Sequence, residues 1–119
     1  MSTLNVSNIT DGTDTVETGY VVNGSAKVWA CHQGASVNGF YQSFNCSTFT
    51  DNGTGDYSIA FTSAMNYSRY TAVCSGYSAV GHSHNINQET STDCHVRPAD
   101  QNGTALDADG HLVIHGDLA

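Results

Sequence analysis

The sequence predicts an all-β fold, either an antiparallel β-sandwich or a jelly roll. Apolar and polar residues alternate in several strand-sized segments, as they do when a sheet buries one face. Clusters of Gly, Asn, Asp and Ser separate these segments, as turns between strands require. Helix signals are nearly absent, because the stretches without frequent Gly, Asn or β-branched residues are shorter than the roughly ten residues of an ordinary helix.

The clearest element is a hairpin that turns at residues 51–55 (DNGTG). Apolar residues share one face on each side of this turn, namely Phe40, Phe44 and Cys46 before it and Tyr57, Ile59, Phe61 and Met65 after it. Further strands are expected at 26–32, 69–79, 91–97 and 111–115, with turns at 100–103 and 107–110. Pro98 is expected to end its strand, because proline lacks the N–H that a ladder uses.

At 119 residues the chain has the size of one domain. We divide it into residues 1–22, an N-terminal arm or first strand, and residues 23–119, the sandwich itself. Leu4, Val6 and Ile9 are apolar but precede the main strands, so the arm is expected to reach a neighbouring subunit.

Charge and composition exclude several classes of partner. The net charge is -8, from 11 acidic residues against 3 cationic ones, which excludes a nucleic-acid surface because such surfaces cluster cations. Neither a secretion signal nor a membrane-inserted segment is expected, since no apolar run approaches the roughly 20 residues that span a bilayer. In an exported chain, two disulfides in any of three pairings could join the four cysteines, Cys31, Cys46, Cys74 and Cys94. Without a secretion signal they are expected as free thiols, with Cys46 as a small core residue.

Two segments, residues 20–29 (YVVNGSAKVW) and 43–57 (SFNCSTFTDNGTGDY), resemble a domain family of bacteriophage tail fibres, especially in phages of marine bacteria and cyanobacteria. The resemblance continues through residues 58–65 and, more loosely, 92–97, and breaks at residues 30–33 and 81–84. It implies a β-rich virion domain, usually trimeric, that attaches to the host or forms part of a fibre.

Tyrosines are the best candidates for contact with a host glycan or protein. Tyr41, Tyr67, Tyr70 and Tyr77 lie among Ser, Asn and Gly, a mixture that suits binding surfaces. Trp29 lies in the family-like segment and is interpreted as a core or inter-subunit anchor rather than a ligand platform.

His82 and His84 are the candidate metal ligands. Two imidazoles at i and i+2 on an extended strand point to the same side, and neutral imidazole binds transition metals. One chain supplies only two ligands, but three chains about a threefold axis would supply six, as similar pairs do in some phage spike tips. The alternative is a polar loop that exposes both rings, and no other cofactor is expected. His95, Asp93 and Arg97 are interpreted as a solvated polar face.

We expect no enzyme, since the spacing reveals no nucleophile with a base, carboxylate pair or complete metal site. The expected function is a structural virion fibre protein that forms homotrimers, contacts other virion proteins and attaches to the host surface after assembly in the bacterial cytoplasm. The alternatives are a head fibre or capsid decoration protein, and a monomeric carbohydrate-binding β-sandwich module.

Overall fold

The computed structural model describes residues 1–77, 82–87 and 89–119 and is mostly β. The first sheet has four antiparallel strands in the order β4, β3, β10 and β7, which span Gly39–Phe44, Val28–Gln33, Gly110–His115 and Thr71–Gly76. The second sheet is also antiparallel, in the order β5, β6, β9 and β8, which span Cys46–Gly53, Asp56–Phe61, Asp93–Ala99 and Ser83–Asn87. The strand expected at 69–79 is β7, and its last residues lie outside the described ones.

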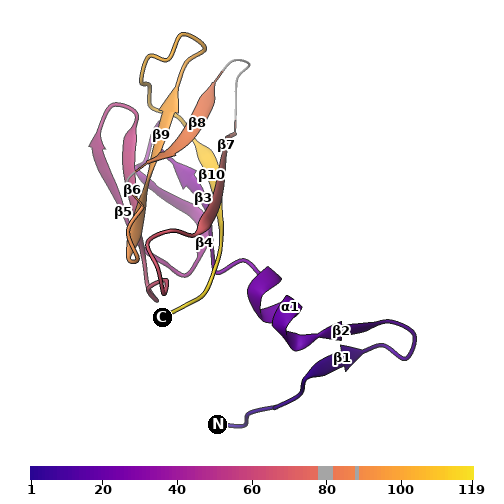
Figure 1. Ribbon diagram of the computed structural model, residues 1–119. Helices are drawn as coiled ribbons and strands as arrows, with labels where there is room; N and C mark the ends of the chain where they lie inside the picture. The colour runs from indigo at the N-terminus through magenta and orange to yellow at the C-terminus, as the bar shows by residue number, and fades with distance from the viewer. Residues whose placement is uncertain (78–81, 88) are drawn as a thin grey trace.

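The two sheets pack face to face around one apolar core, an arrangement consistent with the expected β-sandwich (Figure 1). Both sheets contribute fully or nearly fully buried side chains, which are Val28, Leu112 and Ile114 from the first and Ile59, Phe61, Cys94 and Val96 from the second. Along β6 and β9 burial alternates strictly, so the period-two pattern read from the sequence is the pattern of the core.

The hairpin expected at 51–55 is confirmed, with β5 paired to β6. Gly53 and Gly55 have φ values of 129° and 66°, a backbone region that favours glycine. Pro98 does not end its strand, because β9 continues to Ala99. The ladder between β9 and β6 ends at Val96, so the missing N–H of Pro98 falls beyond that pairing.

The chain crosses from the first sheet to the second at Asn45, between β4 and β5. Asn45 has a left-handed φ of 56°, which Asn tolerates better than most residues. Its side chain accepts a hydrogen bond from the Ser63 N–H at 2.7 Å and donates to the Ser63 carbonyl at 3.1 Å. The side-chain amide of Asn45 therefore joins the β4–β5 connection to the segment that follows β6.

All four cysteines are free thiols, with Cys94 buried and Cys31, Cys46 and Cys74 half-buried. Cys46 packs against the core, as the sequence indicated, and burial raises its pKa to about 11. Burial likewise raises the pKa of Cys94 to about 12. Both thiols therefore act as small apolar groups at neutral pH.

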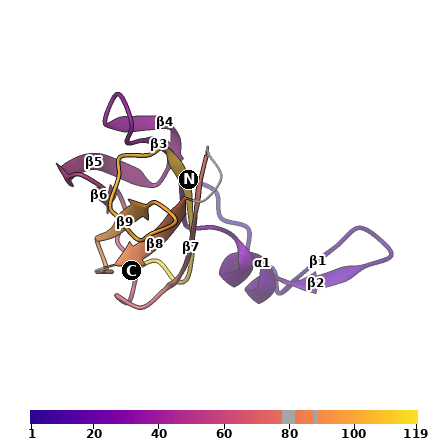
Figure 2. The same ribbon diagram turned by 90° about the horizontal axis from the view of Figure 1, so that it is seen from above.

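The N-terminal segment, residues 1–27, stands away from the sandwich (Figures 1 and 2). It contains a small hairpin of β1 (Asn8–Thr10) and β2 (Thr15–Glu17), followed by a short helix, α1 (Thr18–Gly24). The sequence did not predict this helix, because its Val-Val pair and its glycines are poor helix formers. The chain is otherwise β, as expected. None of residues 1–27, all of which the structure describes, is buried.

Candidate functional site

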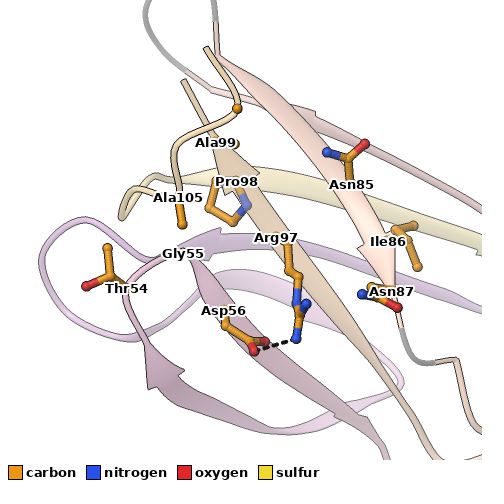
Figure 3. Close-up of a pocket in the computed structure, with 11 residues that line it drawn as sticks. Thr54, Gly55, Asp56, Asn85, Ile86, Asn87, Arg97, Pro98, Ala99 and Ala105 are labelled. Atoms are coloured by element: carbon orange, nitrogen blue, oxygen red, sulfur yellow. Dashed lines mark hydrogen bonds and ion pairs between the residues drawn. The ribbon is translucent and has the colours of Figure 1, made fainter. Parts of the chain in front are cut away.

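A polar groove of about 520 Å³ lies on the outer side of the second sheet (Figure 3). The Asp56 carboxylate on β6 accepts a hydrogen bond from Arg97 Nη2 on β9 at 2.8 Å. Across the groove, Asn85 and Asn87 extend from β8, as Figure 3 shows. The groove thus presents carboxylate, guanidinium and amide groups, which are the groups that bind sugars or polar peptides through hydrogen bonds.

The same Asp56 carboxylate belongs to a chain of hydrogen bonds. Its Oδ1 lies 3.0 Å from Nδ1 of His95, and Nε2 of His95 lies 3.0 Å from Oγ of Ser58. This is the atom order of the acid, base and nucleophile of a serine hydrolase. Sequence spacing did not reveal it, because the cross-strand pairing of Ser58 with His95 brings the two together.

Two features of this face argue against serine chemistry. Arg97 shares the Asp56 carboxylate, so that charge is not reserved for His95. Ser58 lies in the middle of β6, which pairs on one side with β5 and on the other with β9. Backbone N–H groups beside Ser58 therefore serve the sheet rather than a developing oxyanion. We interpret the network as one that orders a polar face. Asp93, His95 and Arg97 are half-buried there, rather than fully solvated as the sequence indicated.

A second cleft of about 290 Å³ opens at the first sheet. Tyr41 and Tyr77 both line it and are 61% and 70% exposed. The ring of Tyr77 packs edge-on against His111 at 5.9 Å between centroids. Tyr41 has no cross-strand partner, because Cys31 pairs with Gln42 and His32 pairs with Phe40, so a β-bulge directs Tyr41 to the cleft.

The other two candidate tyrosines lie elsewhere. Tyr67 is 68% exposed and is not part of the cleft lining. Tyr70 is half-buried, donates a hydrogen bond to the Asp93 carbonyl at 2.9 Å and packs edge-on against Phe61. Burial raises the pKa of the Tyr70 hydroxyl above its usual range. Tyr70 therefore acts in the structure as a core residue with one satisfied hydroxyl.

His82 directly precedes β8 and His84 is its second residue; both are half-buried, with Ser83 exposed between them. The ring of His84 is directed into the sandwich, where its centroid lies 6.1 Å from that of His32 on β3. His32 is 1% exposed, whereas its neighbour Cys31 is half-buried in the alternating pattern of β3, so the two side chains are on opposite faces as expected. Among the described residues, three or more His, Cys, Asp or Glu side chains do not gather as metal ligands. The threefold-axis site stays a prediction.

The outer face of the first sheet carries a row of exposed apolar side chains, one from each strand. Phe44 is paired with Trp29, Trp29 with Val113 and Val113 with Val73. Their exposed fractions are 54%, 36%, 36% and 64% in that order. We call these four residues the apolar row. Trp29 therefore lies outside the sandwich core, so its expected role as a core residue is wrong, and its role as an inter-subunit anchor stays a prediction.

No protein-family model, curated protein or solved structure matches the chain. The described part of the chain also holds no helix of the length and apolar character that crossing a bilayer demands.

Proposed function

We propose that the chain is a structural fibre domain of a bacteriophage virion, a tail fibre or receptor-binding component, that assembles as a homotrimer. In the virion it attaches to the host surface or joins other fibre proteins, and it does so without catalysis. The family resemblance of residues 20–29 and 43–57 supplies the virion assignment. The structural observation that supports assembly is the exposure of the N-terminal segment, in which no residue is buried.

The N-terminal segment lacks the contacts that would make it stable by itself. An isolated hairpin of two short strands is marginal in water, and so is a helix of 7 residues. The segment nevertheless presents large apolar side chains to solvent, namely Leu4, Val6, Ile9, Val16, Tyr20, Val21 and Val22. An ordered segment with this surface needs a protein partner, as an assembly arm does.

The dimensions of the molecule support the same conclusion. Its radius of gyration is 16.6 Å, against about 13.5 Å for a compact chain of this length. The longest dimension is 50 Å, while the other two are 29 and 24 Å. The excess comes from the N-terminal segment, which extends to one side of the sandwich (Figure 2).

The apolar row is a second unpartnered surface on the same chain. Sheet faces that contact water are ordinarily polar, and the outer face of the second sheet follows this rule with Asp56, Ser58, His95 and Arg97. The first sheet departs from it across its whole width. The row carries no like charges that would repel a second copy, which matters in a chain of net charge -8. It is therefore suited to contact with another copy of the chain.

Host contact is assigned to the cleft between Tyr41 and Tyr77. Exposed tyrosines beside a carboxylate and an imidazole, here Asp109 and His111, suit a glycan, which stacks on rings and bonds to polar groups. This cleft also favours the alternative of a monomeric carbohydrate-binding module. The N-terminal segment suits equally a head fibre or capsid decoration protein that docks by its arm.

Three measurements separate these functions. Light scattering gives the mass in solution, and a trimer supports the fibre domain, whereas a monomer that binds glycans supports the module. A glycan array with the Tyr41→Ala variant, and Tyr67→Ala as an exposed control, tests the cleft. Labelling of intact virions with an antibody to the chain locates it on the tail or the head. A protein absent from virions contradicts the proposal.

A further inference from the structure

His32 is a buried side chain whose polar atoms are unsatisfied. Its ring is stacked on Phe49 at 5.7 Å and tilted against Tyr57 at 5.9 Å between centroids. Among the described residues, neither Nδ1 nor Nε2 of His32 has a hydrogen-bond partner. Because an unpaired buried polar group costs about 1–3 kcal/mol, such a group calls for a bound water, an ion or a functional role.

His84 is in a similar condition. Both of its ring nitrogens are buried, and among the described residues neither makes a hydrogen bond of ordinary geometry, although the ring lies close enough to the Asp109 backbone for a polar contact. Its strand, β8, belongs to the second sheet, whereas His32 lies on β3 of the first sheet. The two rings therefore face each other from opposite sheets at one end of the sandwich.

The Nε2 atoms of the two rings converge on one point beside Gly110. A methyl group added to Gly110 would lie 2.8 Å from Nε2 of His32 and 2.8 Å from Nε2 of His84. It would also lie 2.7 Å from the carbonyl oxygen of Ser75 on β7. Glycine at this position thus leaves two ring nitrogens and one carbonyl oxygen around a common space.

The protonation state of both rings suits a metal ligand. Burial lowers the pKa of His32 to about 4, and the nearby His84 and His111 lower it further, against the attraction of Asp109. Burial also lowers the pKa of His84, as do His82 and His111, whereas the polar contact with the Asp109 backbone raises it by less. Both imidazoles are therefore neutral at pH 7, so that protons do not compete with a metal for Nε2.

The cleft at the first sheet lies next to this space. His32 and Gly110 line the cleft between Tyr41 and Tyr77, together with Asp109. The carboxylate of Asp109 lines this cleft, and a net charge of -8 favours a cation over an anion in this chain.

We propose that Nε2 of His32 and Nε2 of His84 bind one divalent transition-metal ion per chain, of the Zn²⁺ and Ni²⁺ class, which links the two sheets. Imidazole nitrogen is the ligand that these ions share. The Ser75 carbonyl lies beside the same space, and water completes the coordination. This site differs from a threefold-axis site in its stoichiometry and in its need for His32, and it holds whether or not the chain is a trimer.

The test uses the untagged full chain, stripped of metal by a chelator and titrated with Zn²⁺ or Ni²⁺ by calorimetry. We expect one ion per chain and a rise in melting temperature of at least about 5 °C at saturation. His84→Gln removes one ligand at a half-buried position, and His32→Phe removes the other while filling the space against Phe49. Each is expected to weaken metal affinity at least about 100-fold. His115→Gln on β10 is the matched control and leaves affinity unchanged.

Three results would overturn the proposal. The first is an absence of binding by the native chain. The second is affinity that survives in His84→Gln, which also decides the question if His32→Phe does not fold. The third is one ion per three chains, lost in His82→Gln and retained in His32→Phe, which places the metal on a symmetry axis instead.

Discussion

Replacing Val113 by lysine separates the stability of one chain from the stability of the assembly. Val113 lies at the centre of the apolar row, between Trp29 and Val73, and is 36% exposed. In a lone chain the lysine stem lies along its neighbours and its ammonium reaches water, so folding stability changes by no more than about 0.5 kcal/mol. In an assembly that covers the row, the same ammonium loses its water.

The magnitude follows from the exposed area of the row. The four exposed fractions together amount to about two fully exposed large side chains, so covering them stabilises the assembly by ~3–6 kcal/mol per chain. A buried unpaired ammonium costs several kcal/mol more. A loss of ~3 kcal/mol already weakens association about 100-fold.

Size-exclusion chromatography with light scattering, together with thermal melting, measures both quantities in one protein preparation. The lysine variant is expected to elute as a folded monomer at concentrations where the native chain is a trimer. Thr50→Lys is the matched control, since Thr50 is an exposed strand residue on the outer face of the second sheet. A Val113→Lys protein with the native mass, or a control that dissociates equally, would refute the assignment of the row to an interface.

Three further outcomes are expected. Deletion of residues 1–24 should leave the melting temperature of the sandwich unchanged in monomeric protein, because no described residue of that segment is buried, and should weaken assembly; a lower melting temperature of the monomer contradicts this. Tyr57→Phe should lower the free energy of unfolding by ~1–2 kcal/mol in denaturant titrations, because the buried Tyr57 donates a hydrogen bond from its hydroxyl to Asp107 at 2.9 Å. An unchanged denaturation midpoint counts against that bond. Burial raises the pKa of Asp56, but hydrogen bonds from Arg97 and His95 lower it by more. Its carboxylate therefore stabilises the fold fully above pH 4 and loses this contribution as pH falls through the lowered pKa. In Asp56→Asn the free energy of unfolding should consequently fall less steeply with decreasing pH below 4 than in the native chain. An identical acid dependence in the two proteins argues otherwise.

Alternation of apolar residues made most of the sandwich predictable. Tyr57, Ile59 and Phe61 were assigned to one face from spacing alone, and they are buried together in the structure. Their shared burial follows from an alternation with a period of two, which is visible in the local sequence. The Asp-Asn-Gly turn is equally local, which is why the β5–β6 hairpin was predicted at the right position.

Contacts between strands that are distant in sequence were not predictable in the same way. The Ser58–His95 bond depends on the register of β6 against β9, and the approach of His84 to His32 depends on how two sheets pack. Tyr70 was expected at the surface, yet Phe61 covers one side of its ring. The helix α1 was not predictable either, because its valines and glycines are poor helix formers and a helix of 7 residues is marginal by itself.

The mass of the untagged chain in solution tests the central claim most directly, namely that the N-terminal segment and the apolar row are contacts between copies. Sedimentation equilibrium over a wide range of concentrations is expected to give three times the chain mass of 12.6 kDa. A mass of 12.6 kDa at every concentration would contradict the claim.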